Sequence, residues 1–162
     1  MCCSSGPGLR SRNPDGSPGR PGREAALRVL IVEDTPDRQK TLVRLYREHA
    51  WVLVNTARRA ISLLDAYTFD LISLDYDLAG PEKGDLVAAH ICNSASAQAL
   101  VIVHSMNARG AQRIVAELPD AAAVPLSKIT RDNGTFNRLR SQLRDGVDVD
   151  WQAVFGGGSS AG

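Results

Sequence analysis

The chain has 162 residues, and 19 Lys plus Arg stand against 18 Asp plus Glu for a formal net charge of +1. This balance argues against a protein whose main task is to coat nucleic acid, and the aromatic content of 5% argues against base-stacking platforms. No apolar stretch approaches the ~20 residues of a transmembrane helix, and residues 1–26 lack the apolar core of a signal peptide. We therefore expect a cytoplasmic protein with no membrane partner.

Composition divides the chain into three parts. Residues 1–26 are rich in Gly, Pro and Arg and poor in hydrophobic residues, so we expect a disordered tail there. Residues 27–145 hold the apolar runs of one folded domain, and this length suffices for a compact core. Residues 146–162 are Gly- and Ser-rich at their end and are assigned to a flexible C-terminal tail. Within that tail, Trp151, Val154 and Phe155 are expected to dock on the core, with docking on a partner as the alternative.

Five short, continuous apolar runs alternate with helical patterns through the folded part. The runs are Leu27–Val32, Trp51–Val54, Leu71–Leu74, Ala99–Val103 and Ala121–Val124. Such runs are typical of strands buried on both faces. Helix caps are expected at Thr35, Thr56, Asn107 and either Asp132 or Asn133, and Val87, Ala88 and Ile91 mark the remaining helix. Because right-handed crossovers produce a parallel sheet, the predicted class is α/β: a flavodoxin-like (βα)5 three-layer sandwich with a parallel five-stranded sheet of order 2-1-3-4-5.

Acidic residues stand where two of these strands end. Glu33 and Asp34 follow the first strand, and Asp75 and Asp77 follow the third. Ligands in this fold class bind beyond the carboxyl ends of the strands. Carboxylates that converge there repel one another, so one pKa rises unless a cation lies between them. We expect Mg²⁺ on Glu33, Asp34 and Asp75, and solvated acids without a ligand are the alternative.

The fourth and fifth strands end in groups that can act on a phosphate. His104 is a candidate general acid or base, with a buried structural histidine as the equally weighted alternative. Ser105 offers a hydroxyl, and Asn107 and Arg109 open a helix, where backbone N–H groups bind anions. Lys128 can pair with the carboxylates or with the phosphate in this pocket. The alternative is an exposed loop lysine.

These motifs resemble those of the response-regulator receiver domains over residues 27–145. The resemblance is carried by Ile31-Val32-Glu33-Asp34, Ile72-Ser73-Leu74-Asp75, Ser105 and Lys128. It implies that Asp75 is a phosphoacceptor, that Glu33 and Asp34 hold Mg²⁺, and that a sensor kinase is the partner. Two departures are Met106, where receivers usually have a small residue, and Ile129, where they usually have proline.

The departures are similar to a divergent branch, the cyclic-phosphate-processing receiver-like domains. The matching segments are Leu74-Asp75-Tyr76-Asp77-Leu78 and Val103-His104-Ser105-Met106-Asn107, with Gly84-Asp85 between them. This resemblance implies phosphoesterase-type hydrolysis of cyclic phosphate ends of nucleotides or RNA. The residues it suggests are Asp75, Asp77 and His104 for catalysis and Ser105, Asn107, Arg109 and Lys128 for the phosphate. The alternatives are a stand-alone receiver phosphorylated on Asp75 in two-component signalling and a partner-binding domain without turnover.

Overall fold

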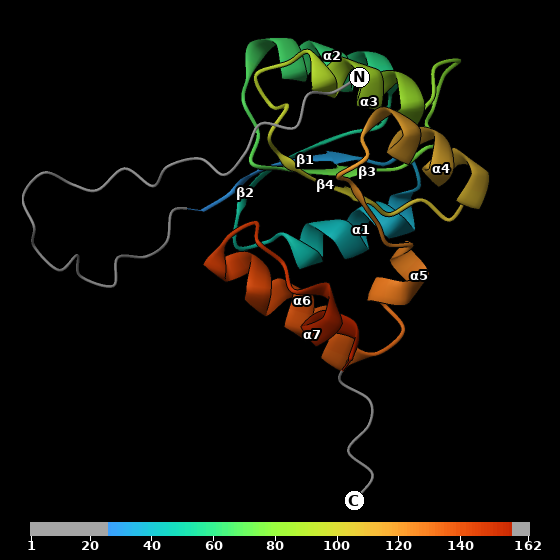
Figure 1. Cartoon of the computed structure of the whole chain (residues 1–162). Coiled ribbons are helices and arrows are strands. Elements are labelled where there is room, and N and C mark those ends of the chain that lie inside the picture. The colour runs from blue at the N-terminus through green and yellow to red at the C-terminus, as the bar shows by residue number, and fades with distance from the viewer. Residues whose placement is uncertain (1–25, 157–162) are drawn as a thin grey trace, which may run out of the picture.

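The computed structural model describes residues 26–156, which form a five-stranded parallel sheet with helices on both faces (Figure 1). The strands are β1 (Arg28–Val32), β2 (Ala50–Val54), β3 (Leu71–Leu74), β4 (Leu100–Val103) and β5 (Ala122–Ala123). The helices are α1 (Pro36–Leu45), α2 (Ala57–Ala66), α3 (Gly84–Cys92), α4 (Ala108–Glu117), α5 (Leu126–Ile129), α6 (Asn133–Asp145) and α7 (Trp151–Phe155). The order β2-β1-β3-β4-β5 confirms the predicted flavodoxin-like fold. The disordered tail expected at 1–26 lies outside the described residues except for Ala26.

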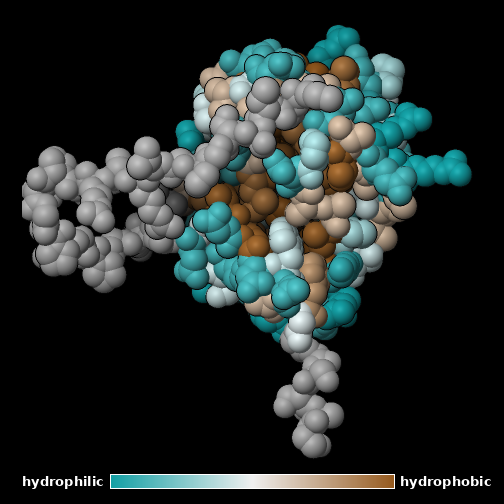
Figure 2. Space-filling model, in the orientation of Figure 1, coloured by the Kyte–Doolittle hydropathy of each residue, from teal (hydrophilic) through white to brown (hydrophobic). Residues whose placement is uncertain are grey.

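The sheet separates two apolar clusters, because successive residues of a strand point to opposite faces. Leu30 and Val32 of β1 pack with α2, α3 and α4, whereas Val29 and Ile31 pack with α1, α5, α6 and α7. The central strands β1 and β3 are buried on both faces, as expected from their continuous apolar runs. The edge strand β2 differs: Trp51 is 42% exposed, and Figure 2 shows an apolar patch in this region.

Side-chain caps fix the starts of several helices as predicted. Thr56, Asn107 and Asp132 each accept a backbone N–H three residues ahead, at the starts of α2, α4 and α6. Thr35 occupies the cap position of α1, but its side chain does not cap the helix. Its hydroxyl instead contacts Asp34 at 3.3 Å. Pro36 still favours a helix start there, because its fixed φ suits the first helical turn.

The folded part extends beyond the expected boundary at residue 145. Helix α7 lies within the range assigned to a flexible tail, and its Val154 is fully buried against the cluster under α1 and α6. In the structure, α7 therefore docks on the core through Trp151, Val154 and Phe155. Burial of these side chains stabilises the folded helix. Residues 157–162 lie outside the described part. Across residues 26–156, no helix combines the length and apolar character needed to cross a bilayer.

Candidate functional site

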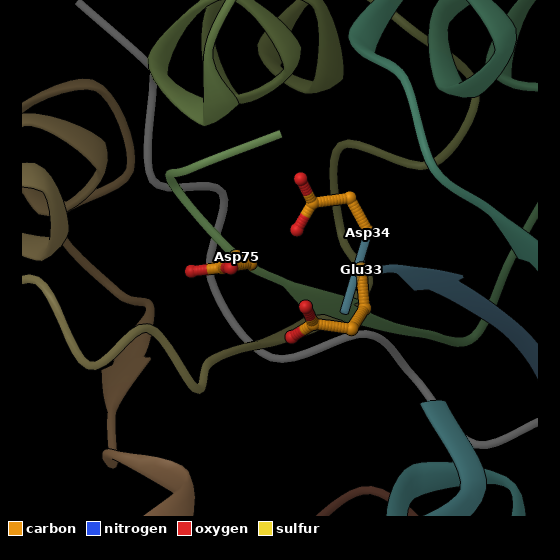
Figure 3. A group of neighbouring side chains, drawn as sticks. All are labelled: Glu33, Asp34 and Asp75. Carbon is orange, nitrogen blue, oxygen red and sulfur yellow. The ribbon is translucent and has the colours of Figure 1, made fainter. Parts of the chain in front are cut away.

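Three carboxylates converge at the carboxyl edge of the sheet (Figure 3). Glu33 and Asp34 directly follow β1 and Asp75 directly follows β3, and these strands pair in parallel with Val32 opposite Leu74. One oxygen from each carboxylate lies within 4.8 Å of the others. Glu33 and Asp75 are buried and Asp34 is partly exposed. The structure thus brings together the three residues that the sequence suggests as metal ligands.

Backbone hydrogen bonds past the strand ends hold these residues in place. The amide of Glu33 donates to the carbonyl of Val54, and the amide of Asp75 donates to that of Val32, each at 3.0 Å. The amide of His104 donates in the same way to Leu74 at 3.1 Å. The parallel ladder therefore continues by one residue at each strand, and the site residues share the rigidity of the sheet.

The two buried acids have pKa values that move in opposite directions. Burial opposes ionisation of Glu33, but hydrogen bonds from His104 and the Thr35 amide, with the charge of Arg38, outweigh it and lower the pKa of Glu33. Burial is also the largest influence on Asp75, where a hydrogen bond from Ser105 lowers the pKa and the charge of Glu33 raises it again. The pKa of Asp75 is raised overall, as expected for a carboxylate that is buried and lies beside a second negative charge.

Arg38, which sequence reasoning did not select, is a cation at this cluster. Its Nη1 lies 3.4 Å from Oδ2 of Asp75 and 4.0 Å from Oε1 of Glu33. Arg38 is partly exposed and lies in the first turns of α1, the helix that starts directly after the Glu33-Asp34 pair. The sequence gives one signal, its position two residues after Pro36 in the helix that begins at this edge, but it does not fix the direction in which the side chain points.

His104 is wholly buried, and both of its ring nitrogens are engaged. Nε2 lies 3.0 Å from Oε2 of Glu33, and because a carboxylate only accepts, the imidazole donates in this pair. Nδ1 shares a 2.9 Å hydrogen bond with the Ser73 hydroxyl, which reaches it from the neighbouring strand β3. The structure therefore places His104 beneath Glu33, with no exposed surface of its own. Ser73 lies within the Ile72-Ser73-Leu74-Asp75 motif, but the sequence pattern indicates no role for it.

The comparisons with known proteins agree with this arrangement. The model of the cyclic-phosphate processing receiver domain matches residues 28–120, which is more than half of the chain. The chain belongs to this family. No curated protein matches it.

Solved structures similar to this cyclic-phosphate processing receiver domain include response regulators and receiver domains. The phosphorylated cyanobacterial phytochrome response regulator RcpA is 18% identical, with a TM-score of 0.53 over 75% of this chain and 91% of its own. The response regulator TrrA of Thermotoga maritima, in complex with Mg²⁺ and BeF, is 20% identical, with a TM-score of 0.56 over 74% and 97%. The receiver domain of the sensor histidine kinase PA1611 of Pseudomonas aeruginosa PAO1, with a magnesium ion in its active-site cleft, is 19% identical, with a TM-score of 0.56 over 77% and 100%. At these identities the likeness establishes the fold.

At the rim of the receiver site, Asn107 connects the loops after β3 and β4. Its Oδ1 caps α4 by accepting the Gly110 amide at 3.0 Å, and its Nδ2 donates to Oδ2 of the exposed Asp77 at 3.1 Å. Its own amide donates to the Ser105 hydroxyl at 3.2 Å. Asp77, Ser105 and Asn107 are therefore brought together beside Asp75, as the sequence suggests.

Of the two basic residues expected at the phosphate, Arg109 is exposed at the start of α4, and its role stays a prediction. Lys128 is part of the short helix α5, and its Nζ lies 4.3 Å from the centroid of the Phe155 ring on α7. Sequence reasoning treated residues 127–128 as a loop. The helical turn instead directs this ammonium toward α7, where an aromatic face attracts it.

Tyr76 fits between α3 and α4 because glycines face it from both helices. A Cβ on Gly84 would overlap the backbone of Asp75 and Tyr76, and a Cβ on Gly110 would overlap the Tyr76 ring. The Tyr76 hydroxyl accepts a hydrogen bond from Nη1 of Arg113 at 3.2 Å. The segment that carries Asp75 is thus packed tightly against the starts of both helices.

Proposed function

We propose that this domain hydrolyses cyclic phosphate ends of nucleotides or RNA, with a divalent cation, Mg²⁺ by preference, on Glu33, Asp34 and Asp75. The observation that carries the proposal is the convergence of these three carboxylates beside a hydroxyl and a guanidinium, Ser105 and Arg38, in a member of this family. Opening a cyclic phosphodiester requires a positioned water, a proton carrier and stabilisation of the charge that develops on the phosphate.

The residues present fit a hard divalent ion. Their donors are carboxylate oxygens, the ligand type that Mg²⁺ prefers, and they lie close enough to share one ion. Burial, and after it the charge of Glu33, raise the pKa of Asp75, and a divalent cation beside this carboxylate would oppose both influences. When bound, Mg²⁺ would polarise a phosphate oxygen and stabilise negative charge on it.

Asp75 is the residue we assign to proton transfer. As a carboxylate at the proposed phosphate position, it can take a proton from the attacking water and release it again at the end of the step. The water oxygen forms a new bond to phosphorus, one ester P–O bond breaks, and the proton passes to the departing sugar oxygen, which leaves a phosphate monoester. We place the Arg38 guanidinium and the Ser105 hydroxyl at the phosphate oxygens, because Arg38 hydrogen-bonds Asp75 and the Ser105 hydroxyl lowers the pKa of the same carboxyl. Asp77, oriented by Asn107, is the acid at the open rim.

We assign His104 to positioning rather than to contact with the substrate. Its ring is buried and both nitrogens already have partners, so it acts through Glu33. A hydrogen bond of this kind fixes the orientation of a metal-binding carboxylate.

The test is hydrolysis of 2′,3′-cyclic nucleotides and of oligoribonucleotides with cyclic ends, with Mg²⁺ and with excess chelator. We expect Mg²⁺-dependent release of phosphate monoester ends that Asp75→Asn abolishes, whereas Lys40→Met on the exposed side of α1 retains them. Folded wild-type protein that opens neither class of substrate with any divalent cation would refute the proposal.

The second candidate is a receiver phosphorylated on Asp75 by a sensor kinase. The observation in its favour is the position of Asp75 after β3, beside Glu33 and Asp34, in a fold shared with the phosphorylated RcpA. The observation against it is Met106, a bulky and 49% exposed side chain directly after Ser105. Beryllofluoride with Mg²⁺ distinguishes the two candidates. A change in the NMR signals around Asp75 supports phosphorylation. Unchanged signals, in a domain that hydrolyses cyclic phosphates, exclude phosphorylation.

A further inference from the structure

An apolar groove lies directly beside the carboxylate site. It has a volume of about 400 Å³ and is lined by Val103, Ser105, Met106, Ala108, Ala111, Gln112, Val115, Ala123 and Pro125. None of these lining residues carries a charge, although the neighbouring site holds three carboxylates and an arginine. The groove therefore suits an uncharged and largely apolar group.

One wall of the groove is a strip along α4. Ala108, Ala111, Gln112 and Val115 are spaced by three or four residues and so share one face of the helix. The adjacent face, with Gly110 and Ile114, packs into the core and is fully covered. Ala111 and Val115 remain half-buried because no described element covers their strip.

Ser105 joins the groove to the proposed phosphate position. Ser105 lines the groove, and its hydroxyl lies close enough to Asp75 to lower the pKa of that carboxyl. Met106, the next residue, lines the groove with half of its side chain exposed. A ligand with its phosphate at Asp75 would therefore extend past Ser105 into the groove.

We propose that the groove receives the base of the terminal nucleoside while its cyclic phosphate lies at Asp75. This inference rests on the proposed function and names the ligand more closely: a nucleoside cyclic phosphate rather than a cyclic phosphate without a base. The volume lies within the range of about 300–1,000 Å³ that is typical of small-molecule sites. A Met thioether packs well against an aromatic ring, and the Gln112 amide can both donate to and accept from a base edge.

A second copy of the chain is the competing occupant. Stable interfaces cover about 800 Å² on each partner and contain several large apolar anchors. Among the lining residues, Met106 is the one large exposed apolar side chain. The groove is thus better suited to a compact ring than to a protein surface.

The experiment compares two probes by calorimetry in Mg²⁺: 2′,3′-cyclic AMP, and glycerol 1,2-cyclic phosphate, which has no base. Where turnover occurs, the ratio of kcat/KM replaces the ratio of Kd. We expect wild type to favour the nucleotide at least about tenfold, which corresponds to 1.4 kcal/mol. Ala111→Phe, which fills the groove, removes this preference and leaves the glycerol probe unchanged. Ala116→Phe, on the exposed face of α4, keeps the preference and is the matched control.

The possible outcomes separate the proposed function from the groove inference. Wild type that neither binds nor turns over either probe refutes the proposed function, and the groove inference with it. Wild type that handles both probes equally, or a folded Ala111→Phe that keeps the nucleotide preference, refutes the groove inference alone. Ala108→Leu, at an exposed position in the same strip, repeats the test if Ala111→Phe does not fold. Sedimentation of wild type and Ala111→Phe identifies the remaining case. If wild type is a dimer, Ala111→Phe is a monomer and the nucleotide preference is unchanged, the groove binds a second copy and the inference is overturned.

Discussion

The imidazole of His104 and the carboxylate of Glu33 form a buried pair, with 3.0 Å between Nε2 and Oε2 and no exposed surface on either side chain. Ser73 holds the other ring nitrogen at 2.9 Å. Oε1 of Glu33 accepts the Thr35 amide at 2.8 Å and faces Arg38. The carboxylate that we assign to metal binding is therefore fixed from both of its oxygens.

Removing His104 should loosen this carboxylate. His104→Ala leaves Glu33 buried without its main partner, so we expect a loss of about 3 kcal/mol in the free energy of unfolding and about a tenfold loss of Mg²⁺ affinity. His104→Gln, which can still donate to Glu33, should recover part of both. Urea unfolding and Mg²⁺ titration measure these effects.

His90→Ala is the matched control, because His90 makes a similar 2.7 Å contact with Asp65 on the surface. Its effect on stability should stay within about 0.5 kcal/mol. A folded His104→Ala with unchanged Mg²⁺ affinity but no activity would contradict the positioning role and assign direct acid–base catalysis to His104.

Arg38 should compete with a divalent cation and assist a phosphate. Arg38→Met keeps the apolar stem but removes the charge 3.4 Å from Asp75, so Mg²⁺ affinity should rise about threefold or more. Affinity for glycerol 1,2-cyclic phosphate should fall, because a charge-assisted hydrogen bond is lost. Lys40→Met, which removes an exposed charge near Asp37, should change neither affinity. Opposite signs for the two ligands identify Arg38 as a phosphate contact, and a parallel loss of both would contradict it.

Some residues of the site could be predicted from the sequence and others could not. Glu33, Asp34 and Asp75 could be predicted because the ends of parallel strands share one edge, so a list of strand ends is already a list of neighbours. The contact of Arg38 with the carboxylates could not be predicted, because it depends on the direction of α1 after Pro36. Lys128 was expected at the same edge, but whether it faces Asp75 or Phe155 depends on a single helical turn, α5, that no periodicity in four residues reveals.

The raised pKa of Asp75 gives stability a definite pH dependence. The folded state keeps the Asp75 proton over a pH interval in which the unfolded chain has lost it. The contribution of this group to the free energy of unfolding is therefore greatest below its ordinary pKa and falls as pH rises through the interval. Asp75→Asn should raise stability at pH 7 by about 1 kcal/mol, or about 2–4 °C in Tm, and flatten that part of the profile.

Mg²⁺ should have the same direction of effect on wild type, because binding to the folded state adds RT ln(1 + [Mg²⁺]/Kd) to its stability. Asp34→Asn should lose this gain, and Asp77→Asn, at the exposed rim, should keep it. A Tm of Asp75→Asn below that of wild type at pH 7, or a Mg²⁺ effect that survives in Asp34→Asn, would contradict the charge balance described for the site.

Gly110 should tolerate no side chain while Tyr76 is present. Alanine is normally the better helix former by about 1 kcal/mol, but a Cβ here overlaps the Tyr76 ring, so Gly110→Ala should destabilise the domain by about 1–3 kcal/mol. In a Tyr76→Gly background, which removes the ring and also the Tyr76 Cβ that lies 2.6 Å from this position, the same substitution should become neutral or stabilising. Thermal unfolding of the four proteins of this cycle measures the change of sign, and additive effects would show that the ring does not pack on Gly110.

Lys128 offers the last test, because its Nζ faces the Phe155 ring at 4.3 Å instead of the carboxylates. A double-mutant cycle of Lys128→Met and Phe155→Leu should give a coupling free energy of about 0.5 kcal/mol in urea unfolding, as expected for a cation–π contact at the surface. Lys128→Met should change the affinity for glycerol 1,2-cyclic phosphate by less than about twofold, whereas Arg38→Met weakens it clearly. A tenfold loss in Lys128→Met with no coupling to Phe155 would show that this ammonium leaves α7 for the phosphate when ligand binds.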